Sequence, residues 1–277
     1  MKIVLITGCS SGIGEATAAR LVTNGWTVYA TARRPETLAG LEQAGCRTLA
    51  LDVTDESSMT EAVDTVVAEA GRIDGLVNNA GYSQSGASET LDLADVRRQF
   101  ETNVFGLLRM SQLVLPTMRA QGSGRIVNIS SMGGRLVFPG GGAYHATKYA
   151  VEAFSDAMRF EVGGFGVHVV LVEPGLITTN FENAAVASMD LEDDGPYGHF
   201  NRKVAAATSD AYSGPLRRLG GPPAAVAKVI EKALTARRPR ARYTVTPSAR
   251  LSIGTRRLMP DRVWDAAMRA QFPRPRP

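Results

Sequence analysis

Strand-like and helix-like segments alternate between residues 3 and 172 of the 277-residue chain. Short apolar runs are each followed by a stretch in which apolar residues recur at helical spacing. Repeated crossovers of this kind require right-handed connections and produce a mostly parallel sheet with helices on both faces. The pattern predicts an α/β fold, a doubly wound parallel sheet of the Rossmann type. Strands are expected at Ile3–Thr7, Trp26–Thr31, Arg47–Leu51, Ile73–Val77, Arg125–Ser130 and Val167–Val172, and helices at Gly12–Asn24, Pro35–Gln43, Glu56–Ala70, Leu93–Gln121 and Ala143–Val162.

The alternation weakens over Leu176–Pro223, which lacks strand signals and contains an acidic run at residues 190–194. A segment of this length within a compact domain is usually a lid or a disordered insert. We expect a substrate lid at about residues 176–223, then a helix, an edge strand and a last helix. We expect a single domain, residues 1–247, with residues 248–277 as its helical tail. The later elements are placed at Ala224–Ala236, Tyr243–Thr246 and Arg262–Gln271, and the lid residues apolar enough to line a pocket are Phe181, Val186, Met189, Tyr197, Phe200 and Val204.

Positive charge is concentrated near the C-terminus. Ala236–Pro277 contains eleven Arg and two Asp, so it carries +9 in a chain whose net charge is +4, which leaves −5 on residues 1–235. A basic tail can attract nucleic acid or anionic lipid. Scattered arginines at the surface or between subunits explain it more simply, and we expect no nucleic-acid partner.

The remaining composition argues against several classes of protein. Cys9 and Cys46 form no CxxC or metal-ligand spacing, and three scattered histidines offer no zinc cluster, so no metal is expected. The apolar run Ile3–Ile6 is too short for a signal peptide or a membrane span. We therefore expect a reduced, cytoplasmic protein without a transmembrane segment. Cys9 follows the first strand, at a helix N-terminus where a thiol pKa can fall, although a small residue filling a turn is the simpler interpretation.

A glycine-rich turn connects the first strand to the first helix. It has the form Gly8-x-x-x-Gly12-x-Gly14, with Ser10, Ser11 and Ile13 between the glycines. Such a turn lets the backbone approach a pyrophosphate, which then lies at the N-terminus of the helix. Because the turn follows a strand and opens a helix, it predicts a dinucleotide site.

The end of the second strand indicates which dinucleotide is bound. A carboxylate at this position would bond the free 2′-hydroxyl of NAD, but the chain has Arg33 and Arg34 there. Guanidinium groups pair with phosphate, so NADP is favoured over NAD, unless both arginines are solvated loop charges before Pro35. Asp52, which ends the third strand, is either a cap or turn residue or an adenine contact.

Tyr144 and Lys148 lie four residues apart on a predicted helix, so they share one face. A neighbouring ammonium, together with an oxidised nicotinamide, would lower the pKa of the phenol. The phenol could then donate a proton to a carbonyl oxygen as hydride arrives, or accept one in the reverse reaction. Ser131 ends the fifth strand and could bond the same oxygen.

These motifs together resemble the short-chain dehydrogenase/reductase family. The matching residues cover roughly residues 1–180, in the order Thr7-Gly8-x-x-x-Gly12-Ile13-Gly14, Asn78-Asn79-Ala80-Gly81, Asn103, Ser131, Tyr144-x-x-x-Lys148 and Pro174-Gly175. The spacing of the family, with its serine thirteen residues before the tyrosine, selects Ser131 rather than Ser130.

The resemblance implies a single-domain fold, NAD(P) and a catalytic tetrad of Asn103, Ser131, Tyr144 and Lys148. It also implies that Lys148 binds the nicotinamide ribose and that Asn103 holds a water in a proton relay. Asp52 and Val53 resemble adenine contacts, Asn79 supports the sheet beside Ala80 and Gly81, and Ile177 and Thr179 resemble nicotinamide contacts. The family's usual basic residue in the turn of many NADP enzymes is replaced by Ser11, which weakens the preference for NADP without reversing it.

The segment around Arg33 and Arg34 and the long C-terminal part look most like the retinol and hydroxysteroid dehydrogenases of the family. Met132, Leu136, Val137 and Phe138 would form an apolar pocket wall, or be ordinary loop packing. We expect an NADP-dependent oxidoreductase, a homodimer or homotetramer, acting on a carbonyl or alcohol of a steroid-, retinoid- or lipid-like molecule. The alternative is a non-catalytic NADP-binding sensor or scaffold, which would not need the complete tetrad.

Overall fold

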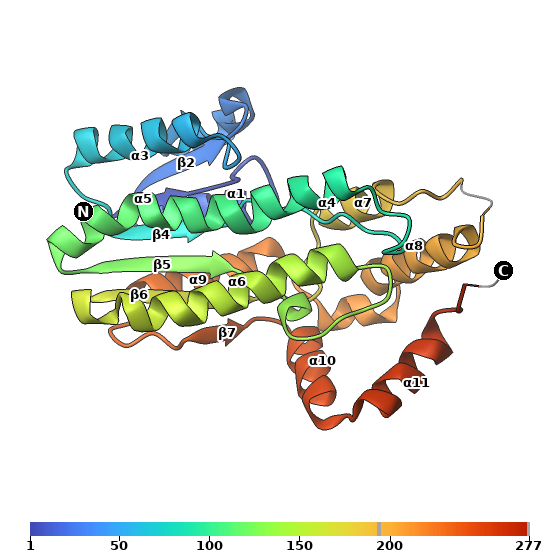
Figure 1. The fold of residues 1–277 in the computed structure, drawn as a ribbon. Helices are drawn as coiled ribbons and strands as arrows, with labels where there is room; N and C mark the ends of the chain where they lie inside the picture. The colour runs from blue at the N-terminus through green and yellow to red at the C-terminus, as the bar shows by residue number, and fades with distance from the viewer. Residues whose placement is uncertain (193–194, 276–277) are drawn as a thin grey trace.

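The computed structural model describes residues 1–192 and 195–275, and within them all paired strands of the sheet are parallel (Figure 1). The strand order is β3-β2-β1-β4-β5-β6-β7. Successive strands are added on one side of β1 as far as β3, and then on its other side from β4 onward, so the order of addition changes direction between β1 and β4. This is the doubly wound parallel sheet that the sequence predicts, so the expected fold class is confirmed. The strands are β1 (Ile3–Ile6), β2 (Thr27–Ala32), β3 (Arg47–Ala50), β4 (Gly75–Asn78), β5 (Gly124–Ile129), β6 (Val167–Glu173) and β7 (Arg242–Thr244).

Helices cover both faces of the sheet because its strands are apolar on both sides. In β1, Val4 and Ile6 pack on one face, while Ile3 and Leu5 pack on the other, as the two-residue period of a strand requires. The first face is covered by α1 (Gly12–Thr23) and α9 (Pro223–Thr235), with η1 (Pro35–Leu38) and α2 (Ala39–Gln43) at its edge. The second is covered by α3 (Glu56–Ala70), α5 (Gly106–Gln121) and α6 (Gly142–Glu161).

The long helix expected over Leu93–Gln121 contains a π-helical turn. It consists of α4 (Leu93–Phe100), the π turn η2 (Glu101–Phe105) and α5. A π turn adds a residue to one helical turn and is frequent at functional sites. Asn103 lies within it, so its side chain departs from the register of a regular helix.

Two helices occupy the segment that the sequence showed only as irregular. They are α7 (Phe181–Ala187) and α8 (Gly198–Ser213), followed by the short η5 (Pro215–Leu219), and they lie beyond the carboxyl ends of the strands (Figure 1). Five of the six apolar residues expected to line a pocket, namely Val186, Met189, Tyr197, Phe200 and Val204, pack together with Ala87 and Phe272 as a small separate core. Asp193 and Asp194 of the acidic run lie outside the described residues.

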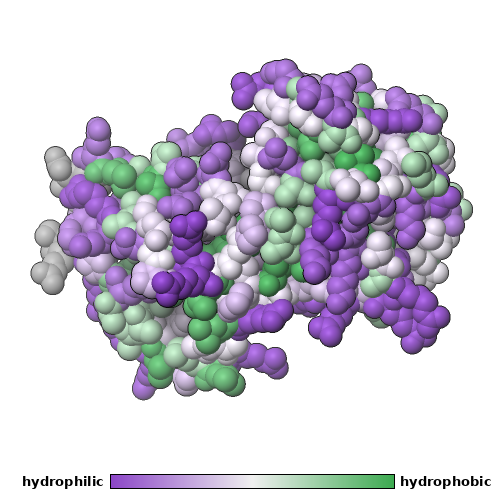
Figure 2. All heavy atoms as spheres, turned by 180° about the vertical axis from the view of Figure 1, so that it is seen from behind, coloured by the Kyte–Doolittle hydropathy of each residue, from purple (hydrophilic) through white to green (hydrophobic). Residues whose placement is uncertain are grey.

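The C-terminal part forms a helical hairpin where the sequence predicted one helix. α10 (Pro247–Leu258) precedes α11 (Asp261–Gln271), and the pair projects from the body (Figure 1). Leu251, Leu258 and Val263 on this hairpin are exposed, and the corresponding lower left of Figure 2 carries apolar surface. Within residues 1–192 and 195–275, no helix has the length and apolar character needed to cross a membrane.

Candidate active site

The glycine-rich turn has backbone geometry that side chains would prevent. Gly8 and Gly12 have φ angles of 71° and 63°, in the region that favours glycine. A Cβ on Gly14 would lie 2.2 Å from the carbonyl oxygen of Gly8, and a Cβ on Gly8 would lie 2.8 Å from Cα of Ala80. The turn is therefore a bare backbone cradle at the start of α1, with Ser10 and Ser11 exposed beside it. This cradle fits a pyrophosphate.

Asn79 holds this cradle against the end of β4. Its amide nitrogen donates to the carbonyl oxygens of Thr7 at 3.0 Å and Gly8 at 2.8 Å. The hydroxyl of Thr7 in turn accepts from the backbone N–H groups of Asn79 and Ala80. The structure thus brings the two glycine-containing motifs together, with Gly81 directly behind them near Asn103 and Lys148.

The adenine end of the expected site is open to solvent. Arg33 and Arg34 directly follow β2 and are both exposed, and neither has a carboxylate partner within the described residues. The carboxylate of Asp52 accepts hydrogen bonds from the backbone N–H and the hydroxyl of Thr54, so Asp52 stabilises the turn after β3. Val53 is buried, and Gly106 of α5 packs closely on its backbone.

Ser131, Tyr144 and Lys148 converge at the carboxyl end of β5. The hydroxyl of Ser131 lies close enough to the phenol of Tyr144 to lower its pKa. The ammonium of Lys148 lies 5.7 Å from the centroid of the Tyr144 ring and donates to the carbonyl oxygen of Ile129 at 2.8 Å. Both residues lie in α6, which begins at Gly142. Because residues four apart share one face of a helix, Tyr144 and Lys148 are directed to the same side of α6.

Burial shifts the pKa values of this pair in opposite directions. It raises the pKa of the Tyr144 phenol, and the nearby hydroxyl of Ser131 offsets part of that rise. It lowers the pKa of Lys148 to about 8, against a smaller opposing effect of the Glu152 carboxylate. In the absence of an oxidised nicotinamide, the phenol of Tyr144 is therefore protonated at neutral pH.

Asn103 connects the π turn to α6. Its amide nitrogen donates to the carbonyl oxygen of Tyr82 at 2.9 Å and to the hydroxyl of Thr147 at 3.1 Å, and its amide oxygen accepts from the N–H of Tyr82. All of its strong donors and acceptors have protein partners. The side chain is thereby held beside Gly81 and within the same region as Lys148.

The segment after β6 passes over the glycine-rich turn. The carbonyl oxygen of Pro174 accepts from the N–H of Met132, and Gly175 packs tightly against Thr246, where a Cβ would lie 2.4 Å from Oγ1. Ile177 is buried, and Thr179 lies close to Gly12, with Cγ2 3.2 Å from the position of a Cβ there. Of the sequence-predicted cofactor contacts, Asn79, Ala80 and Thr179 therefore lie directly against the cradle.

The residues of the loop after Ser131 that are expected to form a pocket wall differ in how far they are buried. Leu136 is fully buried and belongs to the protein core, whereas Val137 is exposed. Phe138 is half-buried, and its ring centroid lies 6.0 Å from those of His145 and Trp264. Only part of this segment can therefore face a substrate.

The sequence does not predict the contacts that three residues make around Tyr144. Phe181 at the start of α7 makes an edge-to-face contact with its ring at 5.3 Å, and His145 lies on its other side at 5.8 Å. Tyr212 on α8 is near enough to influence the phenol electrostatically. The sequence predicts Phe181 only as an apolar lid residue that could line a pocket, and no local pattern places Tyr212 or His145 beside the phenol.

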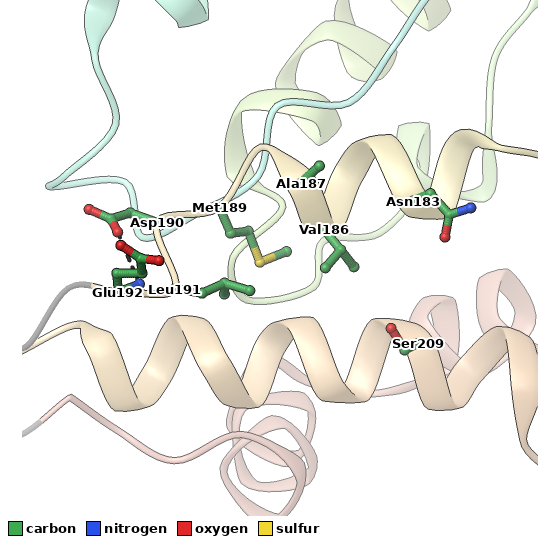
Figure 3. A pocket seen from close by; sticks show the side chains of 8 residues that line it. All are labelled: Asn183, Val186, Ala187, Met189, Asp190, Leu191, Glu192 and Ser209. Atoms are coloured by element: carbon green, nitrogen blue, oxygen red, sulfur yellow. Dashed lines mark hydrogen bonds between the residues drawn. The ribbon is translucent and has the colours of Figure 1, made fainter.

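A cavity of about 480 Å³ lies between α7 and α8 and does not include the tetrad (Figure 3). Val186, Met189 and Leu191 supply its apolar side, while Asp190 and Glu192 lie at one end. The cavity therefore belongs to the lid helices, and α7 extends from it to Tyr144 through Phe181.

The two thiols are structural. Burial raises the pKa of Cys9 to about 12 and that of Cys46 to about 11, which opposes thiolate formation. The thiol of Cys9 donates to the carbonyl oxygen of Ile6. The described residues also contain no group of three or more His, Cys, Asp or Glu side chains arranged to hold a metal.

Residues 2–190 match the family model described as short chain dehydrogenase. The chain belongs to the short-chain dehydrogenase/reductase family. This short-chain dehydrogenase is 36% identical to the 3-ketodihydrosphingosine reductase of Bacteroides thetaiotaomicron, with 97% of each chain covered. It is 32% identical to the NADPH-dependent 3-dehydrocapnine reductase of Ornithobacterium rhinotracheale, over 96% of this chain and 95% of the relative.

The solved structures agree with this assignment. The closed form of serine dehydrogenase complexed with NADP⁺ superposes with a TM-score of 0.76 at 32% identity, covering 88% of this chain and 94% of that one. The short-chain dehydrogenase described here is therefore an oxidoreductase that acts on CH–OH groups with a nicotinamide dinucleotide, as the sequence predicts, and the non-catalytic alternative has no support.

Proposed function

We propose that this short-chain dehydrogenase uses NADP(H) to interconvert a carbonyl and an alcohol on an apolar, lipid-like molecule, with Tyr144 as general acid and base. The observation that carries the proposal is the convergence of Tyr144, Ser131 and Lys148 at the end of β5. When bound, the cofactor would supply or accept the hydride. The bare cradle at Gly8, Gly12 and Gly14 would hold its pyrophosphate.

The chain's own residues would manage the proton. In the reductive direction Tyr144 donates its phenolic proton to the carbonyl oxygen, and the hydroxyl of Ser131 donates a hydrogen bond to the same oxygen. Burial keeps the phenol of Tyr144 protonated in the absence of cofactor, so the proton that a general acid donates is in place. Lys148 would orient the nicotinamide ribose and stabilise the phenolate that remains. Asn103, fixed by Tyr82 and Thr147, would position the relay that returns the proton.

Arg33 and Arg34 support NADP over NAD. Both guanidinium groups are exposed at the end of β2 without carboxylate partners in the described residues, so a 2′-phosphate could pair with them. One relative is named as NADPH-dependent, and one similar structure holds NADP⁺.

Lipid-like ketones are the substrate class that the comparisons favour. Two relatives that match nearly the whole chain are named as reductases of 3-ketodihydrosphingosine and of 3-dehydrocapnine. In this chain, Phe181 contacts Tyr144, and the same helix reaches the cavity lined by Val186, Met189 and Leu191. Apolar surface therefore extends from the reacting end along α7, which would suit an alkyl chain.

The segment Leu176–Pro223 would act as a lid over this site. Its two ends are joined, because Ile177 pairs with Gly221 and the N–H of Gly221 donates to the carbonyl oxygen of Leu176. A segment tied at its base can move as a unit above the joined ends. Closing it would exclude water from the reacting carbonyl.

The decisive experiment is the Tyr144→Phe variant, assayed by NADPH oxidation with 3-keto lipids, steroids and retinal. Turnover should fall at least ~10²-fold, the usual contribution of a general acid, while NADPH binding is retained. Tyr149→Phe is the matched control, because Tyr149 is exposed on the same helix. Near-normal turnover in Tyr144→Phe would exclude the mechanism, and activity confined to polar carbonyls would exclude the substrate class.

A further inference from the structure

The imidazole of His145 connects two points of the loop that follows Ser131. Its Nδ1 lies 3.0 Å from the carbonyl oxygen of Gly133, and its Nε2 accepts from the N–H of Phe138 at 3.2 Å. The ring is buried, with 7% of the residue exposed. It is the residue next to Tyr144, so it ties this loop directly to the catalytic helix.

These two contacts require one tautomer of the neutral ring. A carbonyl oxygen only accepts, so Nδ1 must carry the hydrogen, and the N–H of Phe138 only donates, so Nε2 must be bare. Burial lowers the pKa of His145, which favours this neutral form. Both nitrogens therefore have defined and different tasks.

Glycines at both ends of the loop make room for the ring. A Cβ on Gly133 would lie 2.5 Å from Nδ1, and a Cβ on Gly141 would lie 2.7 Å from Nε2. Distances below 3 Å are not tolerated by real side chains, so the loop closes on the imidazole as tightly as its backbone permits.

Each contact leads to a different part of the site. The N–H of Gly133, whose carbonyl oxygen accepts from His145, donates to Oγ of Ser131 at 3.0 Å. Phe138 lies against the ring of Trp264 on α11, with centroids 6.0 Å apart. The Nδ1 side therefore reaches the reacting hydroxyls, and the Nε2 side reaches the loop wall and the C-terminal hairpin.

We propose that His145 is a positioning residue with two separable functions. Through Gly133, its Nδ1–H fixes the orientation of the Ser131 hydroxyl beside Tyr144. Through the N–H of Phe138, its Nε2 holds the apolar wall against which the substrate binds. The proposal rests on the function assigned to Ser131 and Tyr144.

Two substitutions separate these functions. The side-chain amide of Asn replaces Nδ1 of the ring, and that of the longer Gln replaces Nε2. His145→Asn can still donate to Gly133 but does not reach Phe138, so KM for the apolar ketone should rise with kcat nearly unchanged. His145→Gln can still accept from Phe138 but loses Gly133, so kcat should fall with KM nearly unchanged. Each change should be roughly 2- to 10-fold, the effect of one hydrogen bond. His145→Phe should show both changes.

The affinity for NADPH and the melting temperature of each variant identify general damage to the fold. If the Asn and Gln variants change kcat and KM by the same factors, or change neither, the proposal is wrong and the ring only fills space. Tyr144→Phe tests the underlying function separately, because its turnover should collapse whatever the outcome at position 145.

The pH dependence of KM gives a second test, which starts from the wild-type protein. Protonation of Nε2 would set two N–H groups against each other at Phe138, so KM should rise as the solution is made acidic while kcat is less affected. The ionisable side chain that contacts the ring is that of Tyr144, with ring centroids 5.8 Å apart, and Arg135 lies in the loop that the ring holds. Arg135 is directed toward Glu173 at 3.4 Å and Glu152 at 3.8 Å, and Arg256 lies over Trp264.

Glu152 is the competing explanation, because burial raises the pKa of its carboxyl, so it too takes up a proton as the solution is made acidic. His145→Gln distinguishes the two groups, since it removes the imidazole and leaves the carboxylate. Loss of the acid-side rise in KM in that variant supports the proposal, and its persistence assigns the effect to Glu152 and overturns the Nε2 function. A wild-type KM that does not change with acidity also overturns it.

Discussion

Two regions of the molecule, the sheet with its catalytic helix and the lid, are stabilised by different kinds of contact. Around the cradle, polar side chains such as those of Thr7, Asn79 and Lys148 are held by hydrogen bonds to the backbone. In the lid, α7 and α8 are held mainly by apolar contacts with one another, such as those of Met189, Phe200 and Val204. Chemistry requires fixed hydrogen bonds and fixed backbone, whereas substrate choice requires only apolar surface of a suitable shape. We therefore expect changes in the first region to alter cofactor binding or turnover, and changes in the second to alter KM.

After Tyr144→Phe, the largest of these effects should come from Arg33→Ala in the first region. A charge-assisted contact to a 2′-phosphate contributes ~1.5–3 kcal/mol, or very roughly 10- to 100-fold in affinity. NADPH should bind more weakly by that factor while NADH binding is unchanged, as measured by titrating nicotinamide fluorescence. Arg238→Ala, an exposed arginine of the tail, serves as the control. A wild-type preference for NADH would contradict the assignment.

The lid should differ from the sheet in its hydrogen exchange. Amides of α7 and α8 should exchange rapidly without ligands and slow down when cofactor and substrate are both bound, because closure depends on both. Amides of β1, β4 and β5 should stay protected throughout, since they lie in the centre of the sheet. Mass spectrometry of peptides from residues 176–223 would measure this. Equal protection in both states would mean that the segment is fixed structure.

A smaller effect is expected from Phe181→Ala, the point where the two regions meet. The edge-to-face contact with Tyr144 is of a kind that contributes ~0.5–1.5 kcal/mol, so KM should rise roughly 2- to 10-fold with little change in kcat. Steady-state kinetics with an apolar ketone would measure both constants. Phe160→Ala, whose ring is 90% exposed, is the matched control. A fall in kcat alone would place Phe181 with the chemistry instead.

The smallest effect should come from the ion pair between Arg20 on α1 and Glu231 on α9, which lies away from the site. Partly exposed pairs of this kind contribute ~0–1 kcal/mol. Glu231→Gln should therefore lower the free energy of unfolding by no more than that, with cofactor affinity unchanged. Urea unfolding alongside the exposed control Glu36→Gln would test it. A loss of several kcal/mol would show that this contact governs the packing of both helices.

The same contrast explains what the sequence predicts. The order of strands and helices up to Glu173 follows from apolar periodicity, and the glycine turn follows from backbone requirements that only glycine meets. The π turn at Asn103 was not predicted, because it changes helical register without any change in composition. α8 was also missed: Phe200 and Val204 have helical spacing, but they lie among polar residues that conceal the pattern. The roles of His145 and Phe181 depend on contacts across the fold, which no local pattern records.

The contact between α1 and α9 has a consequence for how the chain is made. Arg20 and Glu231 are 211 residues apart, and the face of the sheet that carries Val4 and Ile6 is covered by both helices. During synthesis this face stays only partly covered, by α1, until residues 223–235 have emerged from the ribosome. Such a delay leaves apolar strands available to wrong partners. Chains stalled near residue 200 should therefore bind chaperones or aggregate, and synthesis of the remaining residues, up to 277, should end that exposure.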